Sequence, residues 1–185
     1  MQTINVLVEP SERLTYRLLN PTSDDTNLLF ELDQDPEVMR FISNGVPTSM
    51  ETINEVFVPR LSSFTSIQKG WGMWGVFTAT NNKFIGWVLV RPMHFFSDNP
   101  QFHDLELGWR FKRSSWGQGY ATESAQHVLS ALANQTGITT FSAIAVTENH
   151  ASINIMKKLG MQYVDSGVHK DPLGDMLVDT YRITL

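Results

Sequence analysis

The stretch from Glu106 to Glu123 (ELGWRFKRSSWGQGYATE) constrains this chain more than any other segment. Its pattern predicts a strand, a short loop and a glycine-containing turn that leads into a helix. The first N–H groups of a helix have no partner within the helix, and the helix dipole adds partial positive charge at the same end. Gly117 and Gly119 let a ligand approach the backbone closely, because they have no Cβ. The turn is therefore predicted to bind an anion such as a pyrophosphate.

A second segment makes this weak signal specific. The turn alone matches neither a P-loop, which requires Gly-Lys-Ser/Thr, nor the Gly-x-Gly-x-x-Gly dinucleotide fingerprint, and a helix entry without a ligand has the same pattern. About one helix and one strand further on, roughly 25 residues, lies the segment 143–161 (AIAVTENHASINIMKKLGM). It places Asn149 and Ser152 at the start of a predicted helix, and Gly160 at its end.

The motifs 116–123, Asn149-x-Ala-Ser152 and 158–161 together closely resemble the GNAT N-acetyltransferases, in particular their RimJ/RimL-like branch, which acetylates ribosomal-protein N-termini. The strong resemblance covers residues 104–165, and a fainter one reaches back to Leu14. It implies an acetyl-CoA-dependent N-acetyltransferase whose acceptor is a primary amine, either a small molecule or a protein N-terminus. The amine would attack the thioester directly in a ternary complex. The alternative is a catalytically silent CoA-binding sensor or interaction module of the same fold.

Composition narrows the remaining classes of protein. With 185 residues, 42% hydrophobic and 18% charged, the chain is expected to form one globular domain. Its net charge of −5 argues against nucleic-acid binding, which usually requires a basic face. No cysteine is present, which excludes disulfides and thiol catalysis, and the five histidines form no zinc pattern, so no metal is expected. Without a signal peptide or an apolar run of membrane-spanning length, the expectation is a cytoplasmic protein. The resemblance also allows a homodimer.

The periodicity of the chain predicts the element order β-α-α-β-β-β-α-β-α-β-β, an α/β (α+β) pattern with a mixed sheet. The predicted strands are 16–19, 71–78, 83–91, 101–111, 138–146, 161–168 and 177–183, and the main predicted helices are 25–32, 48–61, 120–134 and 150–159. The resemblance implies a single GNAT acyltransferase domain over residues 14–185, preceded by a short extension at residues 1–13. It implies about seven strands flanked by about four helices, with the sheet split between the fourth and fifth strands.

The resemblance also implies the residues that bind acetyl-CoA. The backbone at the end of the fourth strand would pair with pantetheine as an added strand, and the turn amides would face the pyrophosphate. Asn149 would hydrogen-bond pantetheine, or serve as an ordinary helix cap. Because Trp116 carries no charge, Lys112 and Arg113 are candidates for outer phosphate contacts. The implied cofactor-binding residues are Trp109, Arg110, Phe111, Lys112, Arg113, Trp116, Gly117, Gln118, Gly119, Tyr120, Ala121, Thr122, Asn149 and Ser152.

Acetyl transfer requires a base, because an ammonium group has no lone pair with which to attack. Glu106 is the first candidate, with His103 and Asp104 as rivals, and the competing interpretation is a structural carboxylate paired with a neighbouring strand. Many family members carry a tyrosine acid where this chain has Met156, which cannot donate a proton. Ser152 is the substitute candidate, unless its hydroxyl only bonds to the backbone.

The acceptor is not identified by any motif. Protein N-termini, polyamines, amino sugars and small amino compounds are all compatible with the sequence. Five carboxylates suggest an acidic mouth that would suit a cationic amine. These are Asp33, Asp35, Glu37, Asp104 and Glu106.

Overall fold

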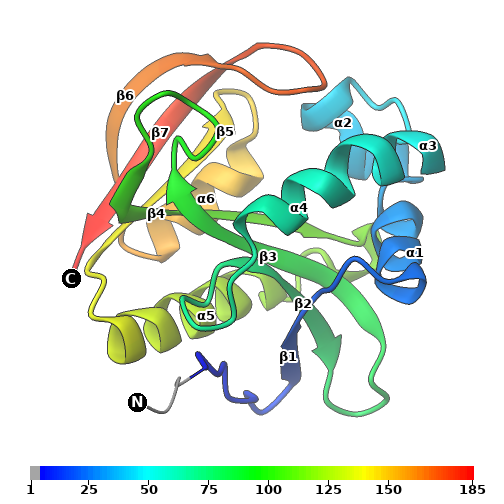
Figure 1. Cartoon of the computed structure of the whole chain (residues 1–185), viewed down its shortest axis with the longest axis horizontal. Helices are drawn as coiled ribbons and strands as arrows, with labels where there is room; N and C mark the ends of the chain where they lie inside the picture. Colours follow the sequence, from blue (N-terminus) through cyan, green and yellow to red (C-terminus); the bar gives the residue numbers. More distant parts are fainter. Residues whose placement is uncertain (1–4) are drawn as a thin grey trace.

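The computed structural model describes residues 5–185 as one seven-stranded mixed sheet with helices on both faces (Figure 1). The strand order is β1-β2-β3-β4-β5-β7-β6. The strands are β1 (Leu14–Leu18), β2 (Gly72–Thr78), β3 (Phe84–Met93), β4 (Gln101–Phe111), β5 (Thr140–Val146), β6 (Gln162–His169) and β7 (Met176–Thr184). The predicted seven strands are confirmed. Within residues 5–185, no helix is both long and apolar enough to cross a bilayer.

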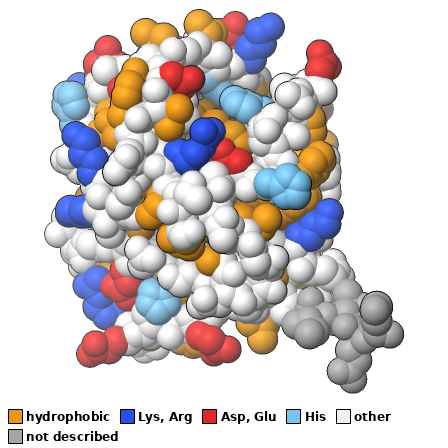
Figure 2. Space-filling model, turned by 90° about the vertical axis from the view of Figure 1, so that its left-hand side faces the viewer, with side chains coloured by type: hydrophobic (Ala, Val, Ile, Leu, Met, Phe, Trp, Pro, Cys, Tyr) orange, Lys and Arg blue, Asp and Glu red, His pale blue; other side chains and the backbone are white. Residues whose placement is uncertain are grey.

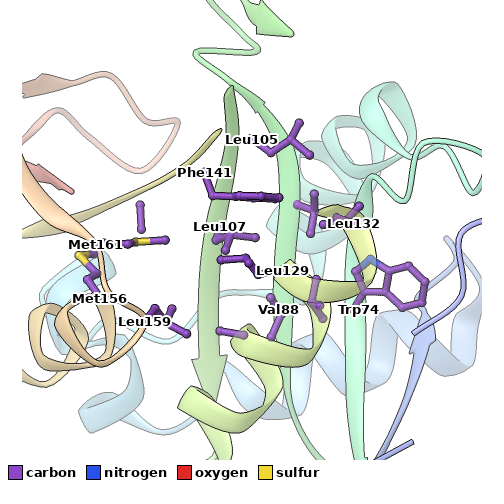
Figure 3. Close-up of a cluster of buried hydrophobic side chains, with 14 of the residues drawn as sticks. Trp74, Val88, Leu105, Leu107, Leu129, Leu132, Phe141, Met156, Leu159 and Met161 are labelled. Atoms are coloured by element: carbon purple, nitrogen blue, oxygen red, sulfur yellow. The ribbon is translucent and has the colours of Figure 1, made fainter. Parts of the chain in front are cut away.

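Two groups of helices cover opposite faces of the sheet (Figure 1). The helices are α1 (Ser23–Leu32), α2 (Pro36–Ser43), α3 (Met50–Thr52), α4 (Val58–Phe64), α5 (Tyr120–Thr136) and α6 (His150–Lys158). Leu129 and Leu132 of α5 pack against Leu105, Leu107 and Phe141 of the central strands (Figure 3). The helices α1, α2 and α4 cover the other face, over β2 and β3. The apolar spacing in each helix fixes which face it buries.

The predicted split of the sheet lies between β4 and β5. These strands run parallel, and they pair only where residues 104–106 meet residues 140–142. Beyond Glu106, β4 continues to Phe111 along β3, while β5 continues to Val146 along β7. One edge of β4 is therefore unpaired from Leu107 onward. Its backbone groups are free to pair with an extended ligand.

The region predicted as a single helix over residues 48–61 is built from three consecutive pieces. Between α3 and α4 lies a π-helical turn, Ile53–Phe57. Pro59 lies in the first turn of α4, directly after the π-helical turn, and the chain stays helical through it.

Part of the segment before β1 contributes to the core. Of the predicted extension 1–13, residues 1–4 lie outside the described residues. Val6 and Val8 are 3% and 7% exposed and belong to the apolar cluster beneath α5. The Val6 N–H donates to the Ile67 carbonyl at 3.0 Å, which attaches this segment to the loop before β2.

Candidate active site

The glycine turn presents a row of backbone N–H groups. Gly117 and Gly119 have φ of +72° and +79°, values that glycine adopts without strain. The first hydrogen bond into α5 runs from the Glu123 N–H to the Gly119 carbonyl, at 3.0 Å. Within the described chain, the N–H groups of residues 117–122 meet no acceptor. Because they lie at the positive end of the α5 dipole, these free N–H groups are able to bind an anion.

Residues 117 and 119–122 of this row line a cavity of about 470 Å³. The other walls come from α2, from the end of β4 and from one side of α6 along its length. Eleven of the predicted cofactor-binding residues line this cavity: Trp109, Arg110, Phe111, Trp116, Gly117, Gly119, Tyr120, Ala121, Thr122, Asn149 and Ser152. The tertiary structure thus brings together two motifs that are separated in sequence by a helix and a strand.

Three predicted cofactor-binding residues are not among those that line the cavity. Lys112 Nζ lies 3.5 Å from a carboxylate oxygen of Glu31, and Arg113 Nε lies 3.1 Å from one of Asp35. The carbonyl of Gln118 accepts a hydrogen bond from Arg13 at 3.0 Å. Lys112 and Arg113 therefore contact acids of the α1–α2 region, and their predicted phosphate contacts would require these ion pairs to open.

Trp116 joins the turn to the end of β4. Its Nε1 donates to the Phe111 carbonyl at 2.9 Å, while its side chain stays half-exposed beside the cavity. This bond occupies the last carbonyl of β4. Pantetheine pairing along this edge would therefore rely on the other backbone groups of β4 that face away from β3, such as those of Trp109.

Asn149 and Ser152 occupy the start of α6, as predicted. Asn149 is the N-cap, and its Oδ1 accepts from the Ser152 N–H at 3.2 Å. Trp109 Nε1 donates to Ser152 Oγ at 3.3 Å, which leaves the serine hydroxyl hydrogen available for another acceptor. Met156, at the position of the family's tyrosine, is 1% exposed and packs in the core (Figure 3).

Glu106 forms a buried ion pair with Arg91 of the neighbouring strand. Both carboxylate oxygens are engaged, by Arg91 Nε at 2.8 Å and by Nη2 at 3.0 Å. Burial alone would lower the pKa of Arg91, but attraction to Glu106 raises it above its ordinary value. Glu106 is 5% exposed and is not among the residues that line the cavity. The structural pairing weighed for Glu106 is thus present, and its role as a base stays a prediction.

The expected acidic mouth does not form, because arginines pair with most of its carboxylates. Besides Glu106, the ion pairs are Asp33–Arg110 at 2.5 Å, Asp35–Arg113 at 3.1 Å and Asp104–Arg182 at 2.9 Å. Asp104 also accepts from Ser142 Oγ at 2.8 Å, so its local role is to tie β4 to β5. Over residues 5–185, no three His, Asp or Glu side chains gather into a potential metal site.

A second cavity, of about 560 Å³, shares Arg40, Phe41 and Ile42 of α2 with the first. Its other walls come from the end of β5 and from the loop between β6 and β7, and they include Glu148 and Asp175. No local sequence signal indicates that α2 lines both cavities, because the other walls come from distant parts of the chain. Lys158, which resembles an ordinary surface lysine in the sequence, lines the first cavity. Figure 2 shows acidic and basic side chains interspersed over one face of the molecule, with no broad field of one sign.

Comparison with known proteins identifies the family. Residues 13–162 match the family model described as "Acetyltransferase (GNAT) domain". The FsC-acetyl coenzyme A-N(2)-transacetylase of Aspergillus fumigatus is 29% identical over 142 residues, which cover 76% of this chain and 59% of the fungal protein. The uncharacterized protein YkkB of Bacillus subtilis is 28% identical over 155 residues, covering 83% of this chain and 84% of that protein.

Solved structures support the fold. A GNAT-family acetyltransferase from Bacillus anthracis superposes with a TM-score of 0.70 at 23% identity, covering 98% of both chains. RimL, a ribosomal L7/L12 alpha-N-protein acetyltransferase in complex with coenzyme A, gives 0.73 at 16% identity, with 97% and 98% covered. The latter belongs to the branch that the motifs resemble. Since the family model spans most of the chain, and the split sheet and glycine turn agree with it, this protein belongs to the GNAT acetyltransferase family.

Proposed function

We propose that the protein transfers the acetyl group of acetyl-CoA to a primary amine by direct attack in a ternary complex. One observation carries the proposal: the free N–H groups of residues 117–122 belong to a turn that lines a cavity, and the same cavity continues to the unpaired edge of β4. A pyrophosphate joined to an extended, amide-bearing arm matches both parts of this site. The name of the fungal relative, with acetyl coenzyme A as donor and a nitrogen as acceptor, supports the same reaction.

In this reaction the neutral amine attacks the thioester carbonyl, a C–N bond forms, and the C–S bond then breaks to release CoA thiolate. The proton of the attacking amine passes to a base, for which Glu106 stays our candidate, acting through water because the carboxylate lies off the cavity wall. The Ser152 hydroxyl accepts from Trp109 and is free to donate to the leaving sulfur. This placement supports Ser152 as the acid where Met156 replaces tyrosine.

We further propose that the second cavity receives the acceptor. It adjoins the first through α2, so an amine in it can reach the end of the acyl arm. Glu148 and Asp175 on its walls make no ion pair within residues 5–185, unlike the acids paired around β4. An amine that arrives as a cation would therefore find its countercharge here.

The acceptor assignment predicts a selective effect of Glu148→Gln. The KM of the acceptor should rise roughly 5- to 10-fold, as expected for the loss of one partly exposed charge–charge contact (~1 kcal/mol). The KM of acetyl-CoA should stay the same, because Glu148 lies off the first cavity. Steady-state kinetics with each substrate varied in turn would check this. An unchanged acceptor KM would remove Glu148 from the acceptor site.

The function itself is tested by calorimetry with acetyl-CoA, followed by thiol release against a panel of amines and N-terminal peptides. We expect binding together with thiol release for one class of amine, and that class identifies the acceptor. Binding without release on any amine would argue against turnover and for a CoA-binding module. Absence of binding would overturn the assignment of the glycine turn.

A further inference from the structure

We propose that Arg13 is a positioning residue for the phosphate-binding turn: its guanidinium holds residues 118–123 in the conformation that presents their amides. This inference rests on the proposed function, since it takes the bound anion to be the pyrophosphate of the acetyl donor. Arg13 lies just before β1, about a hundred residues from the turn in sequence. It is not among the residues that line the cavity, so it would act through the turn and not on the ligand.

One guanidinium contacts three parts of the turn. Arg13 Nη1 donates to the Gln118 carbonyl at 3.0 Å, next to the left-handed Gly119. Its Nε donates to Glu123 Oε2 at 2.9 Å, and its Nη2 forms an ion pair with the same oxygen. Its Cζ lies 4.5 Å from the ring centroid of Tyr120, the first residue of α5. A planar guanidinium can satisfy such directions together, which a lysine ammonium cannot.

Contacts with the edge of the sheet and with Ser11 hold the Arg13 segment in place. Its carbonyl accepts from the Ala79 N–H at 2.8 Å, which continues the pairing of β1 with β2. Ser11 Oγ donates to Glu123 Oε1 at 2.5 Å, and it accepts from the Leu14 N–H at 3.0 Å. The segment before β1 therefore connects the edge of the sheet to the first turn of α5, and the turn cannot shift without breaking these bonds.

Charge gives the contact a second consequence. Glu123 lies in the first turn of α5, where the helix dipole stabilises its negative charge. The same negative charge would repel a phosphate bound at the turn. Burial would raise the pKa of Glu123, but hydrogen bonds from Ser11 and Arg13 hold it below its ordinary value, so the side chain is ionised at neutral pH. Arg13 neutralises this carboxylate beside the anion site.

The test compares Arg13→Met with Arg17→Met. Arg17 is a matched control, because it also forms an ion pair, with Asp25 at 2.6 Å, and its Cζ lies 4.9 Å from the ring centroid of Phe77. Arg17 does not line the cavity and makes no contact with the glycine turn among the described hydrogen bonds and ion pairs. We expect the calorimetric Kd for CoA to rise roughly tenfold in Arg13→Met, the scale of losing hydrogen bonds from a charged group. Arg17→Met should bind CoA like the wild type. Arg13→Lys, which keeps the charge without the planar fork, should recover only part of the affinity.

An acetyl donor that lacks the pyrophosphate distinguishes a misplaced phosphate-binding turn from a general loss of enzyme activity. With S-acetylpantetheine, kcat/KM should be the same in the wild type and in Arg13→Met, whereas with acetyl-CoA the KM should rise while kcat is retained. If the wild type binds CoA and Arg13→Met binds it equally well, or if both donors suffer equally, the positioning role is wrong. If the wild type does not bind CoA, the proposed function itself is wrong. Failure of the Arg13 role alone is different, because the wild type then still binds CoA.

Discussion

Replacement of Gly119 by Val is expected to reduce CoA affinity by at least ~100-fold, the largest effect on binding of any single change discussed for this chain. Gly119 has φ of +79° immediately before α5. A β-branched residue disfavours that region by roughly 1–2 kcal/mol, so the backbone will rotate toward negative φ. Rotation turns the N–H groups of residues 118–120 away from the cavity, and the anion loses several charge-assisted hydrogen bonds at once, each worth ~1.5–3 kcal/mol. Calorimetry with CoA measures the effect.

Gly137→Val is the matched control. Gly137 ends the same helix with φ of +74°, and a Cβ built on it meets no atom within 4 Å. A Cβ on Gly119 likewise meets nothing closer than Arg13, at 3.7 Å. The two variants should therefore lose similar thermal stability, while only Gly119→Val loses CoA affinity. Equal CoA binding by both variants would contradict the role of the turn.

Glu106→Gln is expected to lower both the folding stability and the rate of acetyl transfer, and by more than any other change discussed for this chain lowers the two. The change leaves Arg91 buried and without its countercharge, and breaking a buried ion pair in this way costs about 3–5 kcal/mol of folding free energy. If Glu106 also accepts the proton of the amine, kcat should fall ~10²- to 10⁴-fold. Urea denaturation and single-turnover acetyl transfer, measured where the variant is still folded, report the two effects separately.

The double variant Glu106→Gln/Arg91→Met decides between the two roles of this carboxylate. Removing both charges removes the unpaired guanidinium, so most of the lost stability should return. We expect the rate to remain low, because the base is still missing. A double variant that regains the wild-type rate would show that Glu106 serves only to pair with Arg91. The same acceptor is used for all variants, so that the pKa of the attacking amine is the same in every rate measurement.

Local sequence was sufficient for the elements whose signals lie within a few neighbouring residues. The bounds of β4 agree with the predicted 101–111, and α5 begins at Tyr120 as the glycine turn indicated. Asn149 caps α6 because its side chain reaches the N–H three residues ahead, an interaction that needs no tertiary partner. The motifs also indicated the family. The turn at residues 116–123 and the helix start at residues 149–152 could be recognised in the sequence because both are local structures, and together they build one cavity.

Only the tertiary structure decided which charges act in the site. In the sequence Asp33 and Asp104 look like free acids, and Glu106 could be either free or paired, yet each of the three is paired with an arginine from another element. The sequence likewise gave no indication that Arg13 contacts the turn, or that α2 separates two cavities. The physical reason is range: a helix cap or a glycine turn is set by neighbours in the chain, whereas an ion pair depends on which strands and helices the core packing brings within about 4 Å. The sequence motifs thus indicated the family and the candidate anion site, and packing determined which side chains surround that candidate site.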